Sequence, residues 1–281
     1  STCFARRGSG VRISLAPPLF LDMNLDVYFV DSFTQKVFSG NAAGVVFHSG
    51  ELTASTMQNI AFENNLSETA FVDTTKDNEI KFYSPLVEVD LCGHATLASA
   101  FIYFNFINKE ADQIIFNSNR GQLAATKKGD AIVMSLPKDN PETEVSLDKF
   151  IDAIGCNVKE AYKGVDDYLV IIENEDTLQN LSPNISKIAA MPSRGVIVSA
   201  KGNEVDFVSR VFGPNVGVDE DPVTGSAHAL LAPYWASILG KKDLTAKQLS
   251  QRQGELSCSV KDTTVEITGH AVLYLRGTIK I

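Results

Sequence analysis

The sequence contains one short pattern twice. Residues 83–90 read YSPLVEVD and residues 212–219 read FGPNVGVD, so eight positions align as aromatic, small, Pro, any, Val, any, Val, Asp. A few residues after each copy, a glycine opens a long run almost without charge. Such a duplication in the same setting predicts two homologous domains of about 100–130 residues each, which is within the usual size of a domain.

The two uncharged runs constrain the architecture further. Residues 93–107 and 226–239 have the composition of helices without a polar face. Such a helix must be enclosed on all sides by the rest of its domain. Pro233, within the second run, predicts a kink or a first-turn break.

The segments around these helices alternate β-branched and aromatic residues with turn residues, which is typical of strands. Strands are predicted at 25–33, 44–49, 68–74, 80–85, 168–173, 195–200 and 206–212, and shorter helices at 52–66 (capped by Thr53 or Ser55) and 182–191. We therefore expect an α+β fold of two homologous domains, each a twisted, mostly antiparallel or mixed sheet wrapped around one central apolar helix.

The boundaries are predicted from changes in composition. Residues 1–22 differ in composition from the rest of the chain. We expect them to be an N-terminal extension, either a tag or an upstream segment. The first domain is predicted at 23–125 and the second at 126–270. The last residues, 271–281, are predicted as a pair of terminal strands that can return to the first domain.

Charge and cysteine content exclude several classes of protein. The net charge is −9, so non-specific binding to nucleic acid or to an acidic membrane is not expected. The four cysteines lie far apart, without the spacing of a disulfide framework or a zinc site, which fits a reducing cytosol. No apolar stretch is long enough to span a bilayer. We expect a cytoplasmic protein.

The starts of the two central helices suggest a binding site. They read Gly93-His94-Ala95 and Gly225-Ser226-Ala227. First-turn N–H groups lack internal partners and carry partial positive charge, and glycine lets a ligand approach the backbone closely. If the pseudo-symmetric domains face each other, the two helix starts together favour an anion such as a carboxylate.

Three side chains at these starts, and one elsewhere, are candidates for chemistry. His94 lies at the first start, Asp221 and Ser226 at the second, and Glu68 where a helix gives way to a strand. Each also has an ordinary structural role open to it. A glutamate at a strand start is usually solvated, a histidine at a helix start usually caps or packs, and Asp and Ser are common helix caps.

Four segments together resemble one family. DSFTQKVFSGNAAGVV, NLSETAFV, FYSPLVEVDLCGHATLASA and GPNVGVDEDPVTGSAHALLAPYWA look like the PhzF-like proteins of phenazine biosynthesis, relatives of diaminopimelate epimerase. The resemblance runs from about residue 25 to the C-terminus. It implies two epimerase-like domains, a homodimer, and an isomerase that needs no cofactor and no metal. The family's phenazine-pathway member isomerises trans-2,3-dihydro-3-hydroxyanthranilate.

The resemblance also implies roles for individual residues. Glu68, in Ser67-Glu68-Thr69, would be the acid and base that moves a proton between ring carbons, with His94 and Asp221 assisting. The implied substrate-binding residues, for a small carboxylate-bearing substrate, are Ser226, Gly93, Gly225, Ser67 and Asn41. Such chemistry calls for a Glu68 pKa raised toward neutrality by a desolvated site. The family's Gly-Asn-Pro-Ala-Ala segment lacks its proline here, which predicts a less rigid loop, and its Arg-Gly-Gly segment reads Arg-Gln-Gly. Neither change touches the implied catalytic residues.

Three other functions are weighed against this one. A two-thiol epimerase or racemase needs a cysteine in each half, and Cys92 supplies at most one. A serine hydrolase built on Ser226 lacks the flanking glycines of a nucleophile elbow, with Thr224 and His228 in their place. A non-catalytic or regulatory binding protein on the same fold stays open.

Overall fold

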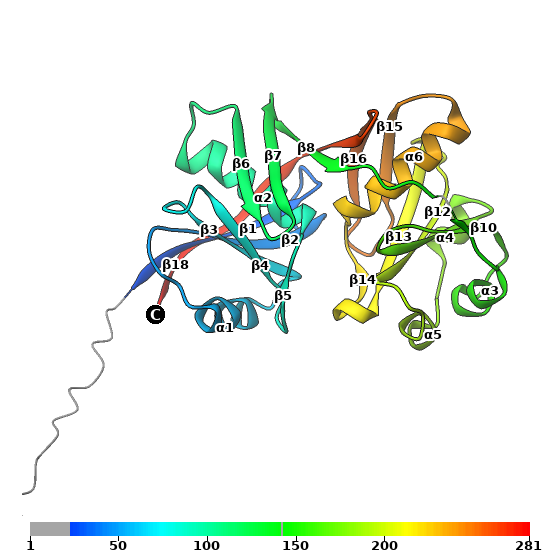
Figure 1. The fold of residues 1–281 in the computed structure, drawn as a ribbon, viewed down its shortest axis with the longest axis horizontal. Coiled ribbons are helices and arrows are strands. Elements are labelled where there is room, and N and C mark those ends of the chain that lie inside the picture. The colour runs from blue at the N-terminus through cyan, green and yellow to red at the C-terminus, as the bar shows by residue number, and fades with distance from the viewer. Residues whose placement is uncertain (1–22, 142) are drawn as a thin grey trace, which may run out of the picture.

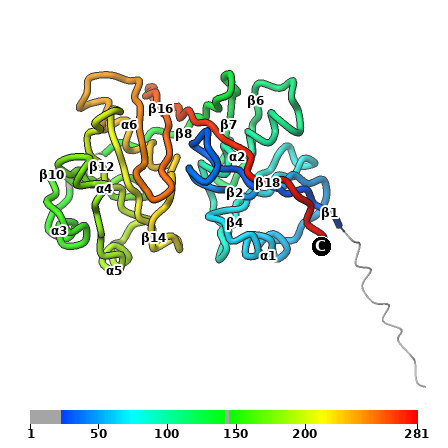
Figure 2. The backbone as a smooth tube through the Cα atoms, turned by 180° about the vertical axis from the view of Figure 1, so that it is seen from behind, coloured from blue at the N-terminus to red at the C-terminus, as the bar shows by residue number. Residues whose placement is uncertain are grey.

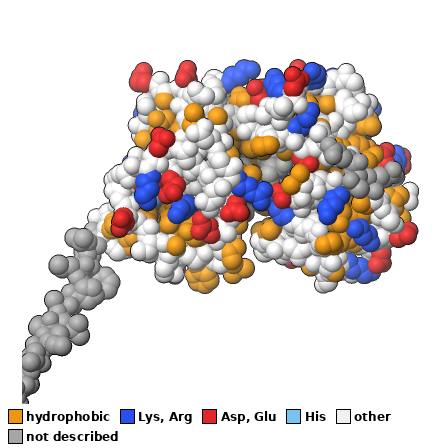
Figure 3. Space-filling view, in the orientation of Figure 1, with side chains coloured by type: hydrophobic (Ala, Val, Ile, Leu, Met, Phe, Trp, Pro, Cys, Tyr) orange, Lys and Arg blue, Asp and Glu red, His pale blue; other side chains and the backbone are white. Residues whose placement is uncertain are grey.

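A computed structural model describes residues 23–141 and 143–281, and the extension expected at 1–22 lies outside the described residues. Figure 1 shows two lobes side by side, one around α2 and one around α6. On the face in Figure 3, acidic and basic side chains are interspersed, with a notch between the lobes at the lower edge. No helix among residues 23–141 and 143–281 is long and apolar enough to cross a membrane.

As far as the structure describes it, the first half of the chain contains eight strands of a sheet that continues into the second half, with two α-helices and a π-helical turn. Its elements are β1 (Asn24–Ser32), β2 (Asn41–His48), α1 (Ala54–Asn64), β3 (Glu68–Asp73), β4 (Glu79–Tyr83), β5 (Glu88–Val89), α2 (Gly93–Ile102), the π-helical turn η1 (Tyr103–Ile107), β6 (Gln113–Ser118), β7 (Gly121–Lys128) and β8 (Ala131–Pro137). Thr53 caps α1 by accepting a hydrogen bond from the Thr56 amide, as expected.

The second half has a similar set of elements and adds short helices. They are β9 (Thr143–Glu144), α3 (Asp148–Ile154), β10 (Val158–Lys163), β11 (Asp167–Ile172), α4 (Glu175–Gln179), α5 (Ile185–Ala189), β12 (Gly195–Lys201), β13 (Phe207–Gly213), η2 (Pro214–Val216), β14 (Val218–Asp221), η3 (Gly225–Ala227), α6 (His228–Leu239), β15 (Asp243–Gln248), β16 (Gly254–Val260), β17 (Thr264–Gly269) and β18 (Ala271–Lys280). The helix predicted at 182–191 is only the short α5.

Strand pairing repeats in the two halves. β1 is antiparallel to β2, β2 parallel to β3, β3 antiparallel to β4, and β4 parallel to β6. β10, β11, β12, β13 and β15 have the same series of orientations. The short strands β5 and β14, which end the two copies of the sequence pattern, pair antiparallel with β4 and β13. The sequence repeat therefore reflects a structural duplication.

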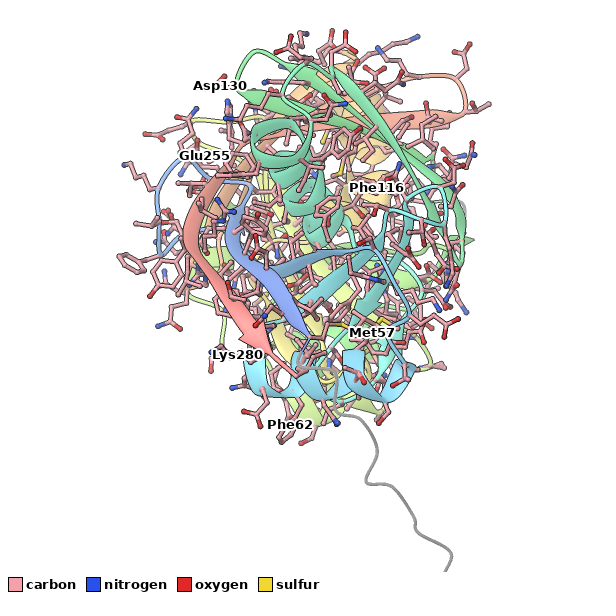
Figure 4. The ribbon with its side chains drawn as sticks, turned by 90° about the vertical axis from the view of Figure 1, so that its left-hand side faces the viewer. Met57, Phe62, Phe116, Asp130, Glu255 and Lys280 are labelled. Carbon is pink, nitrogen blue, oxygen red and sulfur yellow. The ribbon has the colours of Figure 1, made fainter. Side chains whose placement is uncertain are left out.

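Two strand pairs connect the halves. β8 pairs antiparallel with β17, its counterpart in the second half. β18 then runs back along β1, from Ala271 beside Ser32 to Lys280 beside Asn24; Figure 2 shows this return from behind, and Figure 4 shows β18 beside β1 up to Lys280. The prediction of two strands in 271–281 is wrong, because the partner of this segment is β1 rather than a sequence neighbour.

The central helices differ in how far they are enclosed. Every residue of α2 is buried except Phe101, and the α-helix ends at Ile102 before the π-helical turn. α6 continues through Pro233 without the predicted break. Its C-terminal end is not enclosed, since Ile238 is exposed. Leu97 of α2 and Leu231 of α6 belong to one apolar core cluster, so the two helices share a core.

Candidate active site

Strand pairing brings the first candidate residues together. β2 begins at Asn41 and β3 begins at Glu68. Because the two strands run parallel, both residues lie at the same end of the strands. The start of α2 is fixed against β1 by the Ser32 hydroxyl, which donates to the His94 carbonyl at 2.8 Å. His94 therefore lies beside the strand ends that carry Asn41 and Glu68. Ser67 is half-buried in the turn before β3.

Glu68 and His94 form a close pair. His94 Nε2 lies 3.2 Å from Glu68 Oε2, and the two side chains are 5% and 16% exposed. The Cys92 thiol donates to the same carboxylate oxygen at 3.6 Å. Glu68 is thus surrounded by hydrogen-bond donors but keeps a small exposed surface through which a small molecule could reach it.

Asn41 connects this pair to the second half of the chain. Its side-chain nitrogen donates to Asp221 Oδ1 at 2.7 Å and to the Val223 carbonyl at 3.0 Å, and lies 3.1 Å from His94 Nδ1. Both oxygens require a donor, which fixes the orientation of the amide. Asn41 is fully buried. The amide therefore fixes Asp221 and contacts His94, but its two N–H groups are used by Asp221 and Val223, so its approach to His94 Nδ1 is a contact rather than a hydrogen bond.

Asp221 is held from its own half as well. Thr224 Oγ1 donates to Asp221 Oδ2 at 2.5 Å, and Gln248 Nε2 donates to the Asp221 carbonyl at 2.7 Å. Burial, with the Glu68 carboxylate nearby, raises the pKa of Asp221 to about 6 despite opposing contributions from His94, Thr224 and Asn41. A substantial fraction of Asp221 is therefore protonated in mildly acidic solution.

The pKa of Glu68 moves in the opposite direction to the expected one. Burial alone would raise it, but the hydrogen bond and charge of His94, together with the Cys92 hydrogen bond, outweigh burial and hold the Glu68 pKa below its usual value. The expectation of a pKa raised toward neutrality is therefore wrong for Glu68. The carboxyl group with the raised pKa is Asp221.

His94 is the positive partner of Glu68. Burial by itself would lower the His94 pKa, but contacts with Cys92 and Glu68 raise it well above its usual value. Burial, together with the Glu68 charge, raises the pKa of the Cys92 thiol to about 11. Because this thiol is neutral at pH 7, the carboxylate of Glu68 supplies the negative charge that stabilises the imidazolium. The free protein therefore contains a buried Glu68–His94 ion pair.

The starts of the two central helices lie against each other. A Cβ added at Gly93 would come within 3.4 Å of the Ser226 nitrogen and 3.5 Å of the Gly225 Cα. A Cβ at Gly225 would meet the Phe33 ring at 3.0 Å, tighter than an ordinary contact. The first-turn N–H groups of α2 and of the helical segment 225–239 are thus neighbours, as the duplication suggested.

Two side chains of this site were missed in the sequence. Gln248, fully buried on β15, accepts from the Thr224 amide at 2.8 Å as well as bonding Asp221. Arg194, just before β12, donates through Nη1 to Ser226 Oγ at 3.3 Å. Neither lies in a recognisable motif, because strand register rather than sequence spacing brings them to the site.

The side chains of Glu68, Cys92 and His94 also have the chemistry of metal ligands, with ligand atoms within 4.8 Å of one another. The thiol, however, lies 3.4 Å and 3.8 Å from the two ring nitrogens of His94. A thiol in line with one nitrogen would be much farther from the other, so the sulfur lies beside or over the ring. A metal ion bound by all three residues would require the thiol or the ring to move.

Comparison with known sequences identifies relatives over most of the chain. The family model described as phenazine biosynthesis-like protein matches residues 30–277. An uncharacterized isomerase of Pseudomonas aeruginosa is 44% identical over 260 residues, which cover 92% of this chain and 100% of that protein. A phenazine biosynthesis-like domain-containing protein of Homo sapiens is 37% identical over 286 residues, which cover 92% of this chain and 99% of that protein.

Solved structures agree with this likeness. A PhzF-family phenazine biosynthesis protein from Enterococcus faecalis has a TM-score of 0.89 at 42% identity, covering 92% of this chain and 100% of that one. A hydroxyproline epimerase from Agrobacterium vitis has a TM-score of 0.62 at 7% identity, covering 92% of this chain and 93% of that one. At this low identity the likeness shows a shared fold alone. The predicted α+β epimerase-like fold is confirmed, and the chain belongs to the phenazine biosynthesis-like, or PhzF, family.

Proposed function

We propose that the protein is a cofactor-independent isomerase that moves a proton between two carbons of a small, cyclic carboxylic acid. Glu68 is the acid/base in this proposal. The observation that carries it is the Glu68–His94 pair, 3.2 Å apart and almost enclosed, with Glu68 ionised at neutral pH. An ionised carboxylate of this kind is ready to accept a proton, and its exposed surface leaves room for a substrate carbon.

The proposed reaction has two steps. Glu68 removes a proton from a substrate carbon, and the electron pair of that C–H bond delocalises into the adjacent unsaturated system. The carboxyl group of the protonated Glu68 exchanges its proton with solvent through its exposed surface. It then delivers a proton to a second carbon, and the double bond shifts. The first-turn N–H groups at Gly93 and Ser226 stabilise the negative charge between the two steps.

His94 and Asp221 take supporting roles in this proposal. The imidazolium of His94 lowers the basicity of Glu68 in the resting protein and donates a hydrogen bond to it. Asp221, with a pKa of about 6, carries a proton in part of the molecules near neutral pH. It is placed to donate a hydrogen bond to a substrate oxygen or nitrogen, because Asn41 and Thr224 fix its carboxyl group.

The names of relatives support the reaction class. The P. aeruginosa relative is named as an isomerase, and distant neighbours on the same fold include an epimerase. A two-thiol mechanism has less support in this chain: Thr224 stands at the N-cap equivalent to Cys92, and the Cys92 thiol has a pKa of about 11. Ser226 bonds Arg194, which gives no support to a serine hydrolase.

The proposal is tested by offering the purified protein trans-2,3-dihydro-3-hydroxyanthranilate and a panel of small cyclic carboxylic acids. Product isomers are identified by NMR. We expect at least one compound to give an isomer of unchanged mass in native protein and not in Glu68→Gln. A folded native protein that isomerises none of them, yet binds one, would contradict the proposal and favour a non-catalytic binding protein.

A further inference from the structure

Arg194 is a partly buried cation that contacts the start of the second central helix. It precedes β12, and its side chain is 30% exposed. The parallel register of β11 and β12 places Asp167 beside Gly195, so Arg194 and Asp167 are neighbours for reasons of topology. Arg194 plays no part in the proton transfer described above, and its role needs a separate explanation.

The guanidinium of Arg194 is held by one of its two forked edges. Nε donates to Asp167 Oδ1 at 2.9 Å, and Nη2 donates to Asp167 Oδ2. Asp167 is buried, at 5% exposure. This bidentate contact fixes the plane of the guanidinium and occupies the Nε/Nη2 edge. The edge between Nη1 and Nη2 points away from Asp167.

On the second edge, Nη1 donates to Ser226 Oγ at 3.3 Å, at the start of the second central helix. Because Ser226 Oγ accepts this bond, its own hydroxyl hydrogen is available to another acceptor. Burial lowers the Arg194 pKa, but Asp167 and then the charges of Asp166 and Asp221 raise it above its usual value, so the Asp221 charge reaches Arg194. The edge therefore lies beside a hydroxyl donor and within the electrostatic reach of the site.

Another arginine near the site binds a buried aspartate and two backbone carbonyls. Arg252 donates to Asp31 at 2.7 Å, to the Gly40 carbonyl at 2.8 Å and to the Ser39 carbonyl at 3.0 Å. It thereby fixes the loop before Asn41. Arg194 differs, because its guanidinium donates to a side chain at the start of the second central helix.

We propose that Arg194 and Ser226 form the subsite that binds the carboxylate of the substrate. The Nη1/Nη2 edge and the Ser226 hydroxyl donate to the two carboxylate oxygens, while Asp167 holds the guanidinium in place. This inference rests on the proposed function for the identity of the substrate class. It adds a side-chain anchor that distinguishes a carboxylate from a neutral group of the same shape.

The test compares two ligands that differ in charge and little in shape, anthranilate and its neutral amide, anthranilamide. Their affinities are measured by isothermal titration calorimetry with native protein, Arg194→Gln, Arg194→Lys and the control Arg276→Gln. Arg276 is a matched control because it also pairs with an aspartate, Asp26, but lies on β18.

We expect native protein and Arg276→Gln to prefer anthranilate over the amide by about ten- to a hundredfold, the range of charge-assisted hydrogen bonds. Arg194→Gln should lose this preference while its affinity for the amide stays the same. Arg194→Lys should retain part of it, because a lysine keeps the charge and the partner for Asp167 but lacks the forked edge. The lysine variant also serves if Arg194→Gln fails to fold.

Two results would overturn the inference. One is an unchanged preference for anthranilate in Arg194→Lys and in folded Arg194→Gln, which would make Arg194 only a structural partner of Asp167. The other is a native protein that binds neither ligand or both equally. A preference for anthranilate that depends on Arg194, in a protein that isomerises no compound, would support the subsite and contradict the proposed reaction.

Discussion

The side-chain amide of Asn41 donates to the carboxylate of Asp221 across 2.7 Å, between residues 180 positions apart in the chain. This hydrogen bond joins the two halves at the candidate active site. On one side Asn41 contacts His94, the partner of Glu68, and on the other it fixes Asp221. The carboxyl groups of Glu68 and Asp221 are thus linked through the contacting side chains of His94 and Asn41, so a substitution at Asp221 should also affect Glu68.

Replacing Asn41 with leucine should destabilise the protein and raise the pKa of Asp221 further. Leucine has a similar size but no donor, so the Asp221 carboxylate and the Val223 carbonyl lose a buried partner. We expect the free energy of unfolding to fall by about 1–3 kcal/mol, measured by urea denaturation. Asn203→Leu, at an exposed position, should change it by less than about 0.5 kcal/mol. Equal effects in both variants would contradict the bridging role.

Asp221 should make stability depend on pH. Its pKa is raised from 3.8 to about 6 in the folded protein, so the folded state binds this proton more tightly than the unfolded chain does. The stabilisation is fully present below pH 3.8 and is lost as the pH rises through about 6. Relative to Asp221→Asn, the native protein should lose about 3 kcal/mol across this interval. A difference between the two proteins that does not vary with pH would show that Asp221 titrates normally.

The Cys92 thiol should be dispensable for chemistry. Its pKa of about 11 leaves it protonated, and it acts as a hydrogen-bond donor to Glu68. Serine keeps a donor at this position, so Cys92→Ser should retain isomerase activity within a few-fold, measured as product formed per unit time. Activity lost in Cys92→Ser but kept in Glu68→Gln would establish a thiol-based epimerase instead.

Gly269, at the end of β17, should tolerate no side chain. A Cβ there would lie 2.6 Å from Phe33 and 2.9 Å from Leu97 of α2, both fully buried. Gly269→Ala should therefore cost about 1–3 kcal/mol of unfolding free energy through overpacking. In Gly277→Ala the nearest atoms would be 3.6 Å and 3.9 Å away, an ordinary contact, so its melting temperature should match the native one. A tolerated Gly269→Ala would show that this contact relaxes easily.

The sequence predicted the architecture where its signal was periodic or repeated. Copies of one pattern before Gly93 and Gly225 indicated the duplication, and uncharged runs located α2 and the buried part of α6. The strands β6–β8 and β15–β17 were not predicted, because segments such as 243–248 mix charged and apolar residues in half-buried strands. The exposed end of α6 was also missed, since an apolar composition does not say what covers a helix.

The site was predictable only where motifs mark it. Glu68, His94 and Asp221 were identified in the sequence, and the structure brings them together through Asn41. Arg194 and Gln248 were not, because strand register places them. The direction of the Glu68 pKa shift was predicted wrongly, because it depends on the distances to His94 and Cys92 rather than on burial alone.

The central claim, that Glu68 carries the proton, is tested most directly by solvent deuterium. The native protein, Glu68→Gln and Glu63→Gln are incubated in D₂O with an isomerised substrate, and deuterium in substrate carbons is measured by mass spectrometry and NMR. Glu63, exposed on α1, is the matched control. We predict deuterium at the receiving carbon with native protein and Glu63→Gln, and a rate lower by about 10²–10⁴-fold in Glu68→Gln. Deuterium incorporation at the native rate in Glu68→Gln would contradict the account.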